Sequence, residues 1–117
     1  MSIRILCVDD NLPLLTTRKL LLSRLGYDVL TAATAEEARR LFRSTDIDLA
    51  SLDYRLPDVP GDELCVEFKQ INPRTRVMLV SGVYPDRECE CADQFLLKGQ
   101  SPTVLLQAVA TLLKRAA

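Results

Sequence analysis

Five polar residues stand where apolar runs of the sequence end. Asp9 and Asp10 follow the first of these runs, and the ends of the third, fourth and fifth carry Asp53, Ser81 and Lys98. If the runs are parallel strands of one sheet, their carboxyl ends share an edge, which is where open α/β sheets bind ligands. The sequence therefore predicts a crevice that contains three carboxylates, a hydroxyl group and an ammonium group.

Three carboxylates in one crevice need a cation if all are to remain ionised. Each close pair repels by roughly 4 kcal/mol at an effective dielectric constant of ~20. Because the ligands are oxygen atoms, without histidine or a patterned pair of thiolates, Mg²⁺ is favoured over zinc. A carboxylate beside Mg²⁺ can attack phosphorus and form an aspartyl phosphate, while Lys98 and Ser81 contact the phosphoryl oxygens.

Each of these residues also has a simpler explanation. A single aspartate after a strand is usually a turn residue or a helix cap, and Asp9 and Asp10 precede a predicted helix. Ser81 alone would be a hydroxyl with satisfied hydrogen bonds, and Lys98 alone would be a solvated surface residue. Their placement at one sheet edge, in chain order, favours a shared site.

The composition excludes several classes of chemistry. The chain has 117 residues and no histidine, so it contains no Ser-His-Asp triad, Cys-His nucleophile or histidine-bound zinc ion. With 15 basic and 16 acidic residues, its net charge of -1 provides no electrostatic basis for binding nucleic acid or an anionic membrane. The length predicts a single domain.

Cysteine usage and hydropathy indicate a cytoplasmic protein. The four cysteines include no C-x-x-C pair, so free thiols in a reducing compartment are favoured over two disulfides or a zinc site. The N-terminus has no signal-peptide pattern, and no run approaches ~18 apolar residues, so no membrane span is expected.

The apolar pattern alternates between strand and helix spacing along the whole chain. Strands are predicted at residues 3–8, 27–33, 47–53, 77–80 and 94–98. Helices are predicted between them, and the clearest starts are the capping box at Thr34 and the pair Ser101 and Pro102. Residues 83–93 are poorly patterned and hold at most a short helix after Pro85. This (βα)5 alternation predicts an α/β fold with a doubly wound, five-stranded parallel sheet.

An ordered set of motifs resembles the receiver domain of two-component response regulators, the CheY-like superfamily. The motifs are VDDN at residues 8–11, DYRLP at 53–57 with Gly61, SG at 81–82, and ADQFLLK at 92–98 followed by Ser101 and Pro102. The resemblance covers residues 1–117. It implies a flavodoxin-like sheet with strand order 2-1-3-4-5.

The resemblance also implies roles for residues at the strand ends. Asp53 would be the phosphoacceptor and a ligand of Mg²⁺. Asp10 would bind Mg²⁺ directly, Asp9 would act largely through water, and the backbone carbonyl of Arg55 would supply a further ligand. Lys98 would contact the phosphoryl group.

Further residues would govern the conformational response and the lifetime of the phosphoryl group. Ser81 matches the switch hydroxyl and Phe95 the switch aromatic residue, although core packing alone would also explain Phe95. This residue lacks the hydroxyl of the tyrosine that is frequent in the family. Arg55 and Val83 occupy positions that influence dephosphorylation. Because Val83 cannot orient a water molecule, we expect slow loss of phosphate.

By this resemblance the chain would be a phosphorylation-dependent switch rather than a turnover enzyme. The donor would be a phosphohistidine on a sensor histidine kinase or a histidine phosphotransfer protein, since this chain has no histidine. A degenerate receiver acting as a constitutive interaction module is the main alternative. A Mg²⁺-dependent phosphohydrolase is less favoured, because Arg55 stands where such enzymes usually carry a general-acid aspartate.

The sequence departs from the family pattern around its last strand. Gly99 replaces the usual proline after Lys98, and a cis bond before a residue other than proline costs about 3 kcal/mol, so we expect a trans bond and a looser loop. Only 16 residues (82–97) separate Ser81 from Lys98, so the fourth helix is expected to be shortened. A monomer or weak dimer follows, with no output domain in this chain and a signal that leaves through a protein surface.

Overall fold

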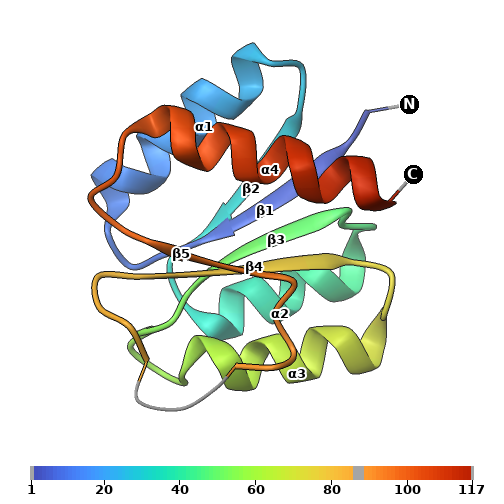
Figure 1. Cartoon of the computed structure of the whole chain (residues 1–117). Coiled ribbons are helices and arrows are strands. Elements are labelled where there is room, and N and C mark those ends of the chain that lie inside the picture. The colour runs from blue at the N-terminus through green and yellow to red at the C-terminus, as the bar shows by residue number, and fades with distance from the viewer. Residues whose placement is uncertain (1, 86–88, 117) are drawn as a thin grey trace.

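The computed structural model describes residues 2–85 and 89–116, and over these residues it contains five strands and four helices (Figure 1). In chain order the elements are β1 (Arg4–Val8), α1 (Leu12–Arg24), β2 (Asp28–Ala32), α2 (Ala35–Ser44), β3 (Leu49–Asp53), α3 (Gly61–Ile71), β4 (Arg76–Ser81), β5 (Gln94–Leu97) and α4 (Pro102–Ala116). All strand pairs are parallel, in the order β2-β1-β3-β4-β5. The predicted α/β fold, sheet and strand order are therefore confirmed.

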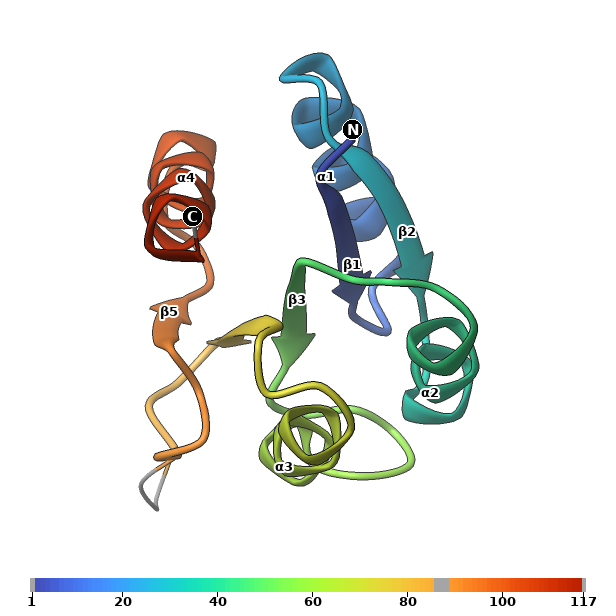
Figure 2. The ribbon, with the colours of Figure 1, turned by 90° about the vertical axis from the view of Figure 1, so that its right-hand side faces the viewer.

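The helices cover both faces of the sheet. In Figure 2, α1 and α4 lie on one side of the strands and α2 and α3 on the other. Side chains of β1 alternate between the two cores: Ile5 and Cys7 pack with residues of α1 and α4, whereas Leu6 and Val8 pack with residues of α2 and α3. A strand buried on both faces needs apolar residues at consecutive positions, which explains the continuous apolar runs of the sequence.

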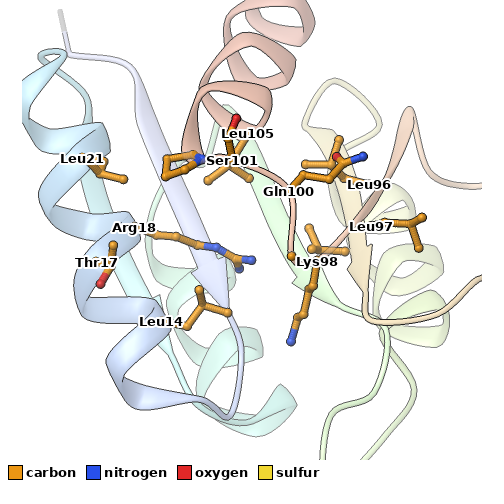
Figure 3. A pocket seen from close by; sticks show the side chains of 13 residues that line it. Leu14, Thr17, Arg18, Leu21, Leu96, Leu97, Lys98, Gln100, Ser101 and Leu105 are labelled. Atoms are coloured by element: carbon orange, nitrogen blue, oxygen red, sulfur yellow. The ribbon is translucent and has the colours of Figure 1, made fainter.

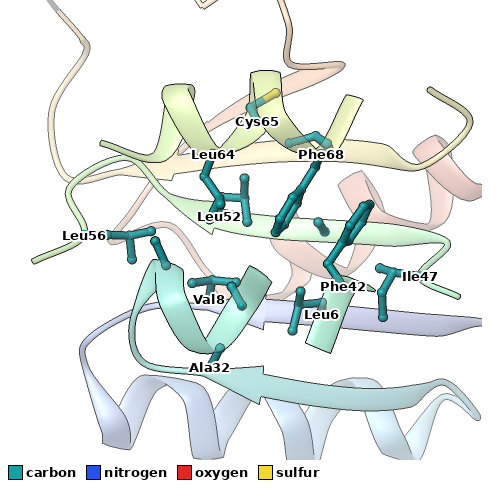
Figure 4. Close-up of a cluster of buried hydrophobic side chains, with 14 of the residues drawn as sticks. Leu6, Val8, Ala32, Phe42, Ile47, Leu52, Leu56, Leu64, Cys65 and Phe68 are labelled. Carbon is teal, nitrogen blue, oxygen red and sulfur yellow. The ribbon is translucent and has the colours of Figure 1, made fainter. Parts of the chain in front are cut away.

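The core between the sheet and the α2–α3 layer is built around two aromatic rings. Phe42 of α2 and Phe68 of α3 stack with their centroids 3.9 Å apart and their planes 2° from parallel (Figure 4). Leu52 and Leu64 belong to the same cluster and are fully buried. This packing holds α3 against β3, the strand that ends at Asp53.

The start of α2 is capped twice. Thr34 is the N-cap, and its side-chain oxygen accepts a hydrogen bond from the backbone N–H of Glu37, as the capping box predicts. Two further N–H groups of the first turn, those of Ala35 and Glu36, donate to the carboxylate of Asp58 at 3.0 Å each. Asp58 belongs to the loop between β3 and α3, so this second cap joins the start of α2 to a loop that is distant in sequence.

The connection from β4 to β5 differs from the (βα)5 expectation. Residues 82–85 and 89–93 are not helical, and the short helix expected after Pro85 falls partly on residues 86–88, which lie outside the described part of the chain. The C-terminal helix, which the (βα)5 pattern predicted as the fifth, is therefore the fourth helix of the described residues and is labelled α4. The physical reason is that this stretch has no apolar repeat at helical spacing that could pack against the sheet.

Asp93 anchors the end of this connection. Its Oδ2 accepts hydrogen bonds from Lys69 Nζ at 2.7 Å and from the backbone N–H of Val77 at 2.9 Å. Arg76 Nη1 lies 3.5 Å from Oδ1 of the same carboxylate. The carboxylate of Asp93, the residue before β5, thus joins this end of the connection to both α3 and β4.

Two further expectations concern the thiols and the membrane. None of the four cysteines forms a disulfide; Cys7 and Cys65 are buried, and Cys89 and Cys91 are half-buried. Burial raises the pKa of the Cys7 thiol to about 11. Among the described residues, no helix combines the length and the apolar character needed to cross a membrane.

Candidate functional site

The register of the sheet aligns the carboxyl ends of four strands. Val8 pairs with Leu52 in the β1–β3 pair, and Ser81 pairs with Leu97 in the β4–β5 pair. Asp53 closes β3 one residue beyond Leu52. The polar residues that end these strands or directly follow them therefore meet at one edge of the sheet.

The structure brings Asp9, Asp10 and Asp53 together at this edge. Carboxylate oxygens of the three residues lie within 4.8 Å of one another. Asp9 and Asp53 are buried, with 0% and 4% of their surface exposed, whereas Asp10 is exposed. These three carboxylates could hold a metal ion that reaches the site from the Asp10 side.

Lys98 lies between the two buried carboxylates. Its Nζ is 2.8 Å from Asp9 Oδ2 and 3.3 Å from Asp53 Oδ2. The other oxygen of each carboxylate is held by the backbone two residues further along: Asn11 N–H donates to Asp9 Oδ1 at 3.0 Å, and Arg55 N–H donates to Asp53 Oδ1 at 3.2 Å. Both carboxylates are therefore fixed with their Oδ2 atoms directed at the same ammonium group.

The pKa of Asp53 shows that its negative charge is disfavoured here. Burial is the largest cause that raises this pKa, and the charge of Asp9 raises it further, while Lys98 partly offsets both. A cation bound among the carboxylates would relieve this repulsion. A donor set made only of carboxylate oxygens fits Mg²⁺, which prefers oxygen ligands.

Ser81 and Phe95 lie on the two strands beside the acidic cluster. Ser81 is buried, and its Oγ accepts a hydrogen bond from the backbone N–H of Val83 at 3.3 Å. Phe95 is half-buried, and its ring stacks on that of Tyr84 with centroids 5.7 Å apart. Tyr84 is 73% exposed, so the segment after β4 covers the Phe95 ring from the solvent side.

The loop after Lys98 takes a conformation that depends on glycine. The Lys98–Gly99 peptide bond is trans, as expected, and Gly99 has φ +88°. Proline cannot adopt this angle because its ring fixes φ near about −65°. Lys98 itself stays paired with β4, because its backbone N–H donates to the carbonyl of Ser81 at 2.8 Å, and the looser loop after it stays a prediction.

Gly61 allows the start of α3 to approach the acidic cluster. A Cβ atom at this position would lie 2.2 Å from the backbone carbonyl oxygen of Asp53. The backbone N–H of Gly61 donates to the carbonyl of Tyr54 at 2.7 Å. A side chain at position 61 would therefore clash with the backbone at the end of β3, which explains why this chain has glycine here.

Arg18 is a residue of the site that the sequence reasoning missed. It lies on α1, is 6% exposed, and places Nη1 3.5 Å from Asp9 Oδ2. The signal was present in the spacing, because Leu15, Arg18 and Leu22 are the buried residues of α1 and recur at intervals of three and four. A charged residue inside such an apolar stripe indicates an ionic partner in the interior.

Comparisons with known proteins identify the family. Residues 5–110 match the family model described as the response regulator receiver domain. The chain therefore belongs to the family of response regulator receiver domains, in agreement with the motifs of its sequence.

The chain is similar to transcriptional regulators along half of their length. The probable transcriptional regulator ycf27 of Cyanophora paradoxa is 33% identical over 116 residues, which cover 96% of this chain and 48% of that protein. The alkaline phosphatase synthesis transcriptional regulatory protein PhoP of Bacillus subtilis is 31% identical over 122 aligned positions, covering 98% of this chain and 50% of that protein. The chain thus spans about half the length of these curated relatives.

Solved structures share the fold closely. A CheY-like response regulator receiver domain protein from Methanospirillum hungatei superposes with a TM-score of 0.93 at 31% identity, covering 99% of this chain and 97% of that one. The response regulator TrrA of Thermotoga maritima, solved in complex with Mg²⁺ and beryllium fluoride, gives a TM-score of 0.87 at 30% identity, covering 96% of this chain and 99% of that one.

Proposed function

We propose that this chain is a phosphorylation-dependent signalling switch that accepts a phosphoryl group on Asp53 with the help of Mg²⁺. The observation that carries the proposal is the position of Lys98 Nζ, 2.8 Å from Asp9 Oδ2 and 3.3 Å from Asp53 Oδ2, inside a cluster of three carboxylates. Phosphoryl transfer depends mainly on positioning and on neutralising charge, and this arrangement supplies both. Membership of the receiver family supports the same assignment.

The proposed donor is a phosphohistidine on a sensor histidine kinase or a histidine phosphotransfer protein. A carboxylate oxygen of Asp53 attacks phosphorus, the bond from phosphorus to the imidazole nitrogen breaks, and that nitrogen keeps the electron pair. The N–H of Arg55 fixes the plane of the attacking carboxylate through Oδ1. The imidazole belongs to the partner, because this chain contains no histidine.

Asp9, Asp10 and Asp53, with the backbone carbonyl of Arg55, are the proposed ligands of Mg²⁺. When bound, the ion would neutralise charge on the transferring phosphoryl group. The ammonium group of Lys98 then exchanges its contact with Asp53 Oδ2 for a phosphoryl oxygen. This exchange removes a charged contact between β5 and β3 and begins the conformational response.

Ser81 and Phe95 form the proposed readout. The Ser81 hydroxyl, which accepts from Val83 N–H in this structure, would donate a hydrogen bond to a phosphoryl oxygen. Because that bond links Ser81 to the segment carrying Tyr84, a shift of Ser81 changes how the Phe95 ring is covered. Val83 is 51% exposed and offers no polar side-chain atom to orient water, so the phosphoryl group is expected to be lost slowly.

The chain as a whole is proposed to be a regulatory module over residues 1–117 rather than a turnover enzyme. Arg55, which would be a general-acid aspartate in a phosphohydrolase, is exposed and contributes its backbone N–H to Asp53. The net charge of -1 supports an output through protein contacts instead of nucleic acid. Four cysteines without a disulfide fit a reducing cytoplasm.

The proposal is tested by intact-protein mass spectrometry after incubation with acetyl phosphate and MgCl₂. Wild-type protein should gain one phosphoryl group only when Mg²⁺ is present, Asp53→Asn should gain none, and the exposed control Asp46→Asn should behave as wild type. A time course after removal of the donor measures loss of phosphate, which should take far longer than seconds. Absence of labelling in wild type would favour a constitutive interaction module, and multiple turnover of a phosphate monoester would favour a phosphohydrolase.

A further inference from the structure

Arg18 is a buried cation beside the acidic cluster that the transfer chemistry above does not use. Its side chain extends from α1 into a cavity of about 120 Å³ that Lys98 borders from the end of β5 (Figure 3). Nη1 lies 3.5 Å from Asp9 Oδ2, and this buried nitrogen has no hydrogen-bond partner within the described chain. Asp9 therefore has two cations at the same oxygen, Lys98 at 2.8 Å and Arg18 at 3.5 Å.

Fold stability does not account for this arginine. A guanidinium stays protonated, and burying it is unfavourable unless its N–H groups are well paired. Here the contact with Asp9 is longer than a hydrogen bond. The neighbouring positions of the buried stripe, Leu15 and Leu22, are apolar, so an apolar residue at position 18 would fit α1 without that cost.

Arg18 changes the net charge of the acidic cluster. The three carboxylates together with Lys98 and Arg18 carry one net negative charge, and without Arg18 they would carry two. A divalent cation is attracted less strongly to the site that contains Arg18. Once that cation is bound, the site carries one positive charge, and a dianionic phosphoryl group in place of the Asp53 carboxylate makes it neutral.

We propose that Arg18 is a positioning residue that sets the charge balance of the site. It weakens binding of Mg²⁺ to the unphosphorylated chain and strengthens retention of the phosphoryl group once Mg²⁺ is bound. It acts through Asp9, whose Oδ2 it shares with Lys98. The inference rests on the proposed phosphoacceptor function of Asp53 and adds a residue from α1 to it.

The test compares Arg18→Met with Lys19→Met. Both variants remove one positive charge from α1, but Lys19 is exposed and its charge is screened by solvent. Mg²⁺ affinity is measured without any phosphoryl donor, from the backbone amide shifts of residues 9–11 and 53–55. Arg18→Met should bind Mg²⁺ about fivefold more tightly, because removing a nearby buried charge shifts the interaction energy by about 1 kcal/mol, and Lys19→Met should differ less than about twofold.

The second measurement is affinity for beryllofluoride, a stand-in for the phosphoryl group, at saturating Mg²⁺. Arg18→Met should bind it about fivefold more weakly than wild type, and Arg18→Lys should restore both affinities by returning the charge. A merely structural role would not shift the two affinities in opposite directions. Changes in the same direction, or two unchanged affinities, would overturn the inference.

Two safeguards keep the outcomes distinct. If Arg18→Met does not fold, Arg18→Gln, which keeps polar atoms but not the charge, is used for the same pair of measurements. If wild type itself binds Mg²⁺ but takes up neither beryllofluoride nor a phosphoryl group, the proposed function of Asp53 fails. If wild type takes up both and the neutral variants match it, the function stands and only the role of Arg18 is rejected.

Discussion

The surroundings of Asp53 disfavour the ionised form of its carboxyl group. It is 4% exposed and shares the cluster with Asp9, whose charge, after burial, is the next cause of the raised pKa of Asp53. The two contacts that favour the ionised form are Lys98 at 3.3 Å and the N–H of Arg55 at 3.2 Å. A raised pKa means that these contacts do not compensate fully, so part of the folding free energy is lost to the functional site.

Replacing this carboxylate with its neutral isostere should therefore stabilise the metal-free protein. Asp53→Asn is expected to increase the free energy of unfolding at neutral pH by about 1 kcal/mol, measured by urea denaturation in the presence of a chelator. Adding Mg²⁺ should stabilise wild type but have little effect on Asp53→Asn, because the cation then loses one ligand. Asp46→Asn, at an exposed position, is the matched control. A destabilised Asp53→Asn with an unchanged control would contradict this account.

Between β4 and β5, where at most a short helix was expected, the carboxylate of Asp93 holds the chain. Burial, the largest single cause, would raise the pKa of Asp93, but the hydrogen bonds from Lys69 and the Val77 N–H, with the charge of Arg76, lower it overall. A lowered pKa means that the ionised form stabilises the fold. The stabilisation is present above the ordinary carboxyl pKa of about 4 and is lost as the pH falls through the lowered value.

Asp93→Asn is expected to reduce the free energy of unfolding by about 1 to 3 kcal/mol at neutral pH, because it weakens charge-assisted hydrogen bonds. The difference from wild type should shrink when urea denaturation is repeated at pH values below about 4. Glu90→Gln, an exposed change in the same segment, should alter stability by less than about 0.5 kcal/mol. A stability difference that stays constant as the pH falls would show that Asp93 acts through packing and not through its charge.

The sequence predicts contacts between residues that are close together in the chain better than contacts between distant ones. The N-cap bond of Thr34 is local, since its partner is three residues away, and the structure confirms this half of the capping box. The second cap, from Asp58, joins positions 22 and 23 residues apart, and no local pattern signals it. Arg18 is an intermediate case: its place in an apolar stripe was visible, but its partner Asp9 lies on another element. The acidic cluster was predictable because strand ends in a parallel sheet share an edge.

For the molecule as a whole, the surface beside β5 is shaped by a connection whose described residues, 82–85 and 89–93, form no helix. All four residues of β5 are half-buried, whereas β3 is buried throughout. The described parts of the β4–β5 connection, residues 82–85 and 89–93, provide no helical face for a symmetric contact. The chain would then have little surface for association at this edge of the sheet.

We therefore expect a monomer of 13.1 kDa, or a weakly associating one, both with and without Mg²⁺ and beryllofluoride. Sedimentation velocity across a range of protein concentrations measures this directly, and the beryllofluoride-saturated sample provides the activated state. Asp53→Asn, which removes the proposed acceptor carboxylate, serves as the unactivated control. A tight dimer that forms only with beryllofluoride and is absent in the control would contradict the expectation.

The cap that Asp58 provides has a mechanical consequence. Its carboxylate accepts hydrogen bonds from the first turn of α2, and its own loop starts after β3, the strand that ends at Asp53, and ends at Gly61, which lies against the Asp53 carbonyl. If this loop is displaced, either α2 moves with it or the backbone N–H groups of Ala35 and Glu36 lose their hydrogen bonds to Asp58. A movement of the loop after Asp53 can therefore be passed through Asp58 to α2. This route to the outer surface of α2 does not involve Ser81 or β5.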